Sequence, residues 1–205
     1  MKKDRKYLIV GLGNAEDKYS GTRHNVGFEV VTALVKSLKG SFRAKDFAYV
    51  AEVTYQEHPL VVIMPTTYMN LSGKAVRYWL KEEGIFVDSL LVVSDDIDLA
   101  VGELRLKPKG GGGNHNGLLD IIEVLGHGNF PRLRFGIGKN FKQGYQINYV
   151  LGKFSSDELE NEVKPSITKA VELIKSFVSL GLSRTMNQYN TRPKQIKPAD
   201  NQEDL

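Results

Sequence analysis

Five polar residues of this sequence lie where a sheet-based site could use them to position water. His24 follows the first predicted strand, and Asn14, Asn70, Asp95 and Asn116 each end a predicted strand or begin a predicted helix. These positions should share one edge of the sheet, which is where open α/β sheets bind ligands. Together the five side chains would form a hydrated site.

Each residue also has an interpretation that involves no chemistry. A single histidine is more often a structural or helix-surface residue. Asn70 and Asn116 are plausible helix N-caps, and Asp95 could cap or hold a turn. From the residues alone, the two interpretations are evenly balanced.

The first strand must deliver Asn14. Residues 7–10 form a short apolar run without alternation, which is typical of a central strand covered on both faces. Gly11 and Gly13 are expected to let the backbone turn sharply at its end. Asn14 then lies at the carboxyl end of the strand.

The following helix must deliver His24. Apolar residues recur at helical spacing from residue 26 to 38, and Thr22 is placed to cap that helix. His24 and Asn25 are therefore expected in its first turn.

The rest of the chain alternates strand and helix patterns. This order predicts an α/β fold, a single-domain sandwich with a twisted mixed β-sheet flanked by helices, over residues 1–190. Residues 141–150 have no clear period and are predicted to be a loop or lid, and residues 191–205 a disordered polar tail. The expected strands cover 47–55, 60–64, 90–94, 102–109 and 132–138, and the expected helices cover 71–84, 118–125 and 155–178.

Composition limits the function classes. The 205 residues contain no cysteine, which rules out disulfides and thiolate metal sites, and their four histidines are not closely spaced. No apolar stretch approaches twenty residues, so no membrane span is expected. We expect a cytoplasmic protein without metal or cofactor. Its net charge of +4 is mild support for a polyanionic partner.

Basic residues form a second group of candidate functional residues. Arg105, Lys107 and Lys109 are two apart, so on a strand they project from one face. Arg134, on a neighbouring predicted strand, would extend the patch. The alternative is a solvated edge face, on which lysines deter aggregation.

A glycine turn after a strand also suggests a dinucleotide site. That fingerprint would run from Gly11 to Glu16, and Glu16 stands where its third glycine belongs. A carboxylate there would meet the pyrophosphate and hinder close helix packing, which disfavours the interpretation.

Four motifs in order resemble bacterial-type peptidyl-tRNA hydrolases: GLGN…Y…TRHNVG, PTTYMNLSG, DDIDL and GNHNGL. The resemblance covers roughly residues 7–187. It implies that His24 is the general base on water and that Asp95 orients its imidazole. Asn14, Asn70 and Asn116 match amides that bind the peptide end, hold the water or donate to the oxyanion.

The resemblance also implies substrate-binding residues. Tyr19 and Met69 match residues that shape the groove around the 3′ end, and Asn25 is expected to bind substrate as well. Lys107 and Arg134 match residues that grip a tRNA phosphate near the acceptor end, which positions the RNA without reading sequence.

The implied activity is metal-independent hydrolysis of the ester between peptide and tRNA, which recycles tRNA released early from ribosomes. The expected partner is peptidyl-tRNA, bound through its acceptor end and 3′ terminus by a monomer. The alternative is a non-catalytic RNA-binding relative of the same fold, similar to a splicing factor.

Overall fold

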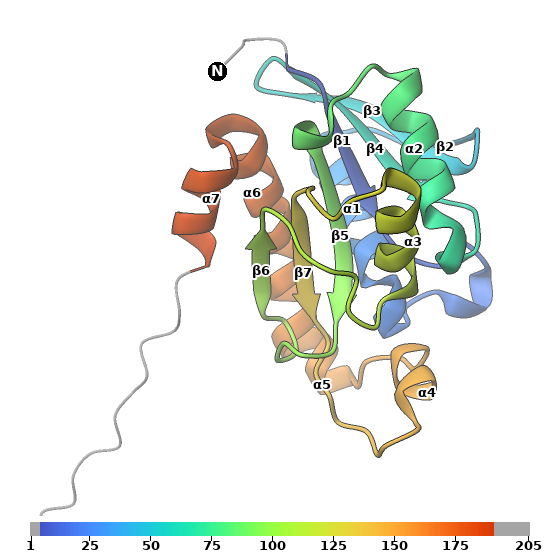
Figure 1. Ribbon diagram of the computed structural model, residues 1–205. Coiled ribbons are helices and arrows are strands. Elements are labelled where there is room, and N and C mark those ends of the chain that lie inside the picture. The colour runs from blue at the N-terminus through green and yellow to red at the C-terminus, as the bar shows by residue number, and fades with distance from the viewer. Residues whose placement is uncertain (1–4, 191–205) are drawn as a thin grey trace, which may run out of the picture.

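The computed structural model describes residues 5–190, which form a seven-stranded sheet with helices on both faces (Figure 1). The strands are β1 (Tyr7–Gly11), β2 (Arg43–Lys45), β3 (Ala48–Tyr55), β4 (His58–Pro65), β5 (Leu90–Asp96), β6 (Leu104–Lys107) and β7 (Arg132–Gly136). The helices are α1 (Val26–Ser37), α2 (Ser72–Glu82), α3 (Asn116–Leu125), α4 (Gln146–Val150), α5 (Ser156–Glu158), α6 (Lys164–Leu180) and α7 (Leu182–Tyr189).

The sheet is mixed, with the order β2-β3-β4-β1-β5-β7-β6. Its centre, β4-β1-β5-β7, is parallel, whereas β2 and β3 on one side and β6 on the other add antiparallel pairs. The predicted mixed α/β sandwich is therefore confirmed. None of the described helices has both the length and the apolar character needed to cross a bilayer.

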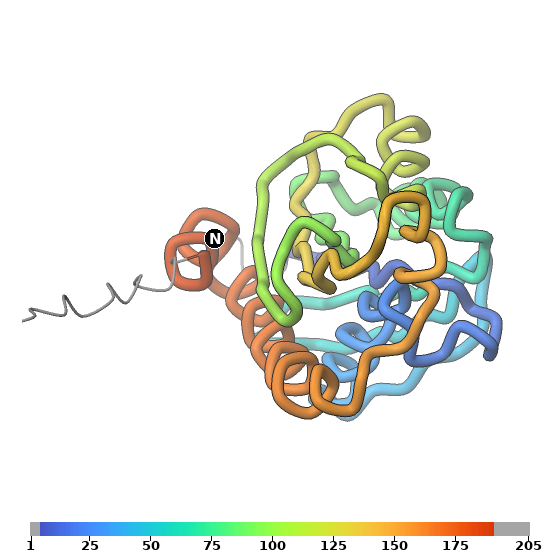
Figure 2. The backbone as a smooth tube through the Cα atoms, turned by 90° about the horizontal axis from the view of Figure 1, so that it is seen from below, coloured from blue at the N-terminus to red at the C-terminus, as the bar shows by residue number. Residues whose placement is uncertain are grey.

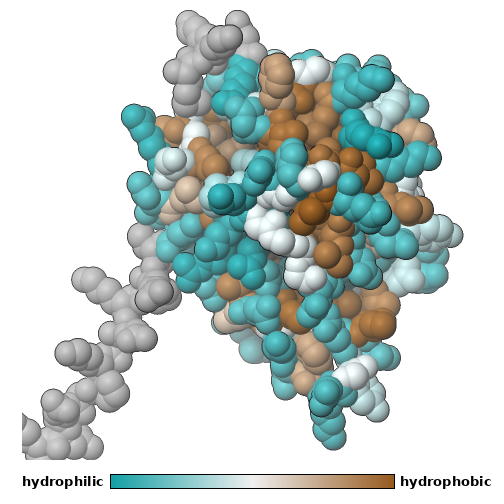
Figure 3. Space-filling view, in the orientation of Figure 1, coloured by the Kyte–Doolittle hydropathy of each residue, from teal (hydrophilic) through white to brown (hydrophobic). Residues whose placement is uncertain are grey.

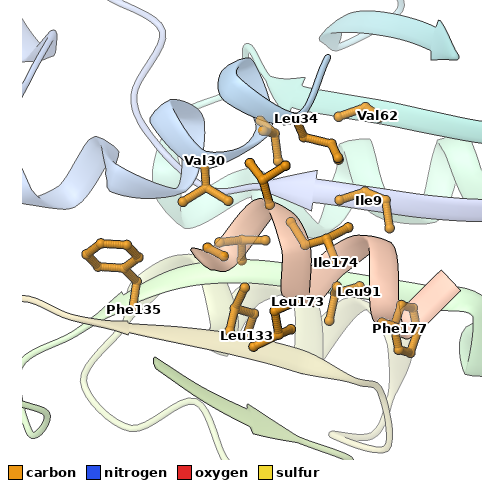
Figure 4. Close-up of a cluster of buried hydrophobic side chains, with 14 of the residues drawn as sticks. Ile9, Val30, Leu34, Val62, Leu91, Leu133, Phe135, Leu173, Ile174 and Phe177 are labelled. Atoms are coloured by element: carbon orange, nitrogen blue, oxygen red, sulfur yellow. The ribbon is translucent and has the colours of Figure 1, made fainter. Parts of the chain in front are cut away.

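Two apolar clusters hold the layers together. Alternate side chains of β1 and β5 pack on α1 and α6, among them Ile9 and Leu91 (Figure 4). The intervening side chains, such as Leu8 and Val92, pack with α2 and α3 on the opposite face. Burial on both faces explains why β1 is a continuous apolar run without alternation.

The strand order fixes where a site can form. From β1 the chain passes through α1 to β3 and β4 on one side, then through α2 to β5 on the other side. The carboxyl ends of β1 and β5 are thus a topological switch point, the usual place for a ligand crevice. Figure 2 views the molecule from this edge, with α4 lying across it.

Some boundaries differ from the predictions for local reasons. The strand expected at 60–64 begins earlier, because the chain turns at Gln56 and Glu57, whose φ values are 46° and 68°, and His58 already pairs within β4. Residues 141–150 are not wholly irregular, because α4 forms within them. The tail predicted for 191–205 lies outside the described residues.

The edge strand β6 is protected by the end of α7. The Asn190 side chain accepts a hydrogen bond from the Leu106 N–H at 3.0 Å and donates one to the Leu106 carbonyl at 2.8 Å. The amide thereby replaces a neighbouring strand at this position, which limits pairing of the edge with another chain.

Candidate active site

Two glycines bring the start of α1 against the ends of β1 and β5. A Cβ on Gly11 would lie 2.4 Å from the Gly27 carbonyl oxygen, and a Cβ on Gly27 would lie 2.5 Å from that of Leu12. Neither Gly11 nor Gly13 has a positive φ, so the expected sharp turn is not the reason for them. Close packing is the reason.

His24 lies just before α1, in the 3-10 turn Arg23–Asn25, and not within the first turn of the helix as predicted. Thr22 does not cap the helix through its side chain, because its hydroxyl donates to the Tyr19 carbonyl at 2.7 Å. The tight turn points the imidazole toward the end of β5.

Asp95 binds two imidazoles through one carboxylate oxygen. His24 Nδ1 lies 2.8 Å from Asp95 Oδ1, and His115 Nε2 lies 2.9 Å from the same atom. The two rings are 4.8 Å apart between centroids. Asp95 is 5% exposed, so its charge is compensated by these neighbours and not by solvent.

The hydrogen bonds assign the tautomers. His115 Nδ1 accepts from the backbone N–H groups of Gly117 and Leu118 at the start of α3, so the proton of this ring lies on Nε2 and donates to Asp95. His24 Nδ1–H donates to Asp95. No hydrogen bond to the Nε2 of His24 is found in residues 5–190, which leaves this nitrogen free to accept a proton.

The ionisation states follow from this geometry. Burial raises the pKa of Asp95, but His115 and His24 hold that pKa well below its ordinary range. Burial lowers the pKa of His24, whereas the charge of Asp95 and the hydrogen bond to it raise that pKa, and the net shift is upward. Asp95 therefore stays ionised at neutral pH and stabilises the imidazolium formed when His24 takes a proton.

Asn14 is held by a neighbouring amide. Its N–H donates to Asn25 Oδ1 and its carbonyl accepts from Asn25 Nδ2, both at 2.9 Å. Asn25 is buried, with both polar side-chain atoms used in this way. We infer that it orients Asn14, and its expected contact with substrate stays a prediction.

The other two asparagines are not helix N-caps. Asn70 lies in a 3-10 turn before α2, and the cap of α3 is His115, one residue before Asn116. Both asparagines are exposed, and neither side chain is hydrogen-bonded within residues 5–190. Their amides are thus free to contact a ligand.

Met69 lies beside His115, and Tyr19 lies in another segment of the chain. A Cβ on Gly117 would lie 2.7 Å from Met69 Sδ and 3.2 Å from His115, so Met69 packs against the start of α3 beside the histidines. Tyr19 is half-buried in a separate 3-10 turn, with Lys18 Nζ 4.9 Å from its ring. Its role in the groove stays a prediction.

A cavity of about 460 Å³ opens beside His24. One wall carries the basic side chains of β6 and β7, a second is the glycine-rich loop 110–113, and a third is α4 with Ile147 and Val150. Asn116 also lines it. The surface over β6 is hydrophilic, as Figure 3 shows.

The basic wall is less uniform than the sequence suggests. Lys107 and Lys109 have no ion pair or hydrogen bond in the described part of the chain. Arg134, by contrast, donates through Nε to Asp96 Oδ2. Arg105, which faces Arg134 across the strand pair, is bonded to Glu103. The two lysines are therefore the free cations of this wall.

Sequence reasoning missed His115, the second hydrogen-bond partner of Asp95. Its signal was present, since this histidine stands between two asparagines at a predicted helix start. The four histidines are far apart in the sequence, but the fold brings two of them to one carboxylate. The ligand atoms of His24, Asp95 and His115 lie within 4.8 Å of one another, an arrangement that could hold a metal ion. In this structure both histidines form hydrogen bonds to Asp95, and His115 also accepts hydrogen bonds from the backbone. Metal independence of the activity stays a prediction.

Comparison with known proteins shows the family of this chain. The family model for peptidyl-tRNA hydrolase matches residues 8–198. The chain belongs to this family. The resemblance drawn from the motifs is thereby confirmed. The peptidyl-tRNA hydrolase of Parabacteroides distasonis is 50% identical over 188 residues, covering 91% of this chain and 100% of that protein. That of Porphyromonas gingivalis is 50% identical over 186 residues, covering 90% and 100%.

Solved structures of the peptidyl-tRNA hydrolase family share the fold. The crystal structure of peptidyl-tRNA hydrolase from Acinetobacter baumannii aligns with a TM-score of 0.86 at 34% identity, covering 93% of this chain and 96% of that one. This chain therefore shares its overall fold with that hydrolase.

Proposed function

We propose that this chain hydrolyses the ester between peptide and tRNA in peptidyl-tRNA, with His24 as general base, and so recycles tRNA released early from ribosomes. The observation that carries the proposal is the His24 imidazole, which is bonded to Asp95 through Nδ1 and lines the cavity with its other nitrogen free. Family membership supports the substrate.

The chemistry needs no further group. A water oxygen attacks the ester carbonyl carbon while its proton passes to His24 Nε2. Free amides of Asn14, Asn70 and Asn116 are available to hold the water and to donate to the oxyanion. The tetrahedral intermediate then collapses, the bond to the ribose oxygen breaks, and the imidazolium returns its proton to that oxygen. The products are a peptide carboxyl and a free tRNA hydroxyl.

The tRNA end is proposed to enter along the basic wall. Lys107 and Lys109 are unpaired cations of the described chain that flank the cavity beside His24. Their charge suits a phosphate of the acceptor end. We propose that the enzyme acts as a cytoplasmic monomer.

A single-turnover assay tests the function. Purified enzyme in excess over peptidyl-tRNA should release free tRNA and free peptide with time. The non-catalytic alternative predicts binding of tRNA without release. All of the relatives named above are called peptidyl-tRNA hydrolases, which favours the first outcome.

Replacement of Lys107 by alanine should raise KM for full-length peptidyl-tRNA and leave kcat nearly unchanged, because the lysine contributes equally to ground-state and transition-state binding. The salt dependence of tRNA binding should weaken by roughly 0.7–0.9 in log–log slope. A minimal substrate without acceptor-stem phosphates should be unaffected. Lys36→Ala, an exposed lysine in the last turn of α1, is the matched control.

Arg134→Ala should raise KM further, because it also leaves the Asp96 carboxylate unpaired beside the cavity. Adding Asp96→Asn should then recover part of the loss. Equal losses of kcat for both substrates would show that these residues support the catalytic site, and an unchanged KM would support a merely solvated basic face.

A further inference from the structure

Helix α4 forms a wall of the cavity although it has no buried residue of its own. Ile147 and Val150 line the cavity, and Ile147 is 71% exposed. Tyr149 and Val150 pack against the core but are only partly buried. A five-residue helix with so little buried surface needs further contacts to hold its position.

The contacts at its carboxyl end come from Arg23, the residue before His24. The Arg23 N–H donates to the Gly152 carbonyl at 2.9 Å. Its guanidinium donates to the Lys153 carbonyl and, at 2.8 Å, to Glu158 Oε2. One side chain therefore bonds two points of the segment that follows α4.

Aromatic rings complete this attachment. The guanidinium carbon lies 4.4 Å from the ring centroid of Tyr149, within α4, and 5.0 Å from that of Phe154. The Tyr149 hydroxyl donates to the Ile137 carbonyl at 2.7 Å. The Arg23 side chain is 10% exposed, so these charged contacts are little screened by water.

Glu158 is itself held in place. It belongs to a capping box in which its carboxylate accepts the Ser155 N–H at 2.7 Å and its own N–H donates to the Ser155 hydroxyl at 3.2 Å. The acceptor for Arg23 is thus fixed to the start of α5 and is not a mobile surface carboxylate.

We propose that Arg23 is a positioning residue for the hydrolysis, which latches α4 to the turn carrying His24. The inference rests on the function proposed above. Since Arg23 and His24 are adjacent in one 3-10 turn, the same turn presents the base to the cavity and holds the opposite wall. The latch sets the width of the cavity in which the 3′ end of the substrate is bound.

Two substitutions weaken the latch from opposite sides. Glu158→Gln removes the negative charge that pairs with Arg23, while its amide oxygen can still accept the Ser155 N–H. Arg23→Lys keeps the positive charge but lacks the planar fork that reaches two acceptors at once. The matched control is Glu160→Gln, which breaks the exposed ion pair of Glu160 with Lys164 nearby.

Both latch variants should raise KM for peptidyl-tRNA by about three- to tenfold, since a site formed only part of the time binds more weakly in proportion. Their kcat should stay within about twofold, because the Asp95–His24 pair is untouched. Amide hydrogen exchange should become faster in residues 145–152 and remain unchanged in β5 and α1. Glu160→Gln should change neither KM nor kcat, and it should leave the hydrogen exchange of residues 145–152 as in the wild type.

The outcomes separate the latch from a purely structural role. Faster exchange throughout the protein with a matching fall in kcat and unchanged KM would overturn the proposal, as would latch variants that behave like Glu160→Gln. If the wild type does not cleave peptidyl-tRNA at all, the proposed function fails. The exchange of residues 145–152 then still decides whether Arg23 holds α4.

Discussion

Replacement of His24 by alanine is expected to lower kcat by roughly 10²–10⁴-fold, the usual contribution of a positioned general base. The fold should survive, because Asp95 keeps its hydrogen bond to His115 when the His24 ring is removed. Single-turnover hydrolysis of peptidyl-tRNA measures the loss, and circular dichroism with thermal unfolding checks the fold. Binding of tRNA should be little affected, since the basic wall remains.

His127→Ala provides the matched control. This exposed histidine lies in the connection between α3 and β7, and its Nδ1 accepts only the Asn129 backbone N–H, at 3.2 Å. The His127→Ala variant should hydrolyse peptidyl-tRNA at the wild-type rate. A His24 variant that did so as well would contradict the assignment of the base.

Replacement of Asp95 by asparagine is the second large expected effect. The amide oxygen can still accept hydrogen bonds from the two imidazoles, but the charge that stabilises the imidazolium is lost. We expect kcat near neutral pH to fall by about 10²–10⁴-fold, comparable with removal of a charged triad member. Asp88→Asn, an exposed carboxylate at the other end of β5, should have no such effect.

The pH dependence gives this prediction its sharpest test. His24 must be neutral to act as a base, and its pKa lies above the ordinary value of 6.5. The wild-type kcat/KM should therefore fall as the pH drops through a midpoint above 6.5. In Asp95→Asn the negative charge that raises the pKa of His24 is absent. The midpoint of kcat/KM for this variant should therefore move to lower pH. An unmoved midpoint would show that Asp95 and His24 are not coupled.

The sequence by itself determined most of the elements, though not β2, α4 or α7, and it indicated the edge of the sheet at which the candidate site lies. A short unbroken apolar run is typical of a strand buried on both faces, and β1 is one. The Ser155–Glu158 capping box, another local pattern, is also present. Such features depend on residues close together in the chain, so hydrophobic periodicity and capping or turn residues are enough to predict them. The family motifs then supplied the candidate roles.

Only the tertiary structure decided which partner each polar side chain takes. Asp95 meets His24 across 71 residues and His115 across 20, and nothing local distinguishes this from a carboxylate that caps a turn. The same holds for Arg134, which pairs with Asp96 because parallel β5 and β7 align in one register. Partners of this kind depend on strand register and on the close approach of α1 to the sheet. Strand register and the approach of α1 depend on the packing of the whole domain. A buried charge is stable only with a compensating group nearby, and packing decides which groups are near.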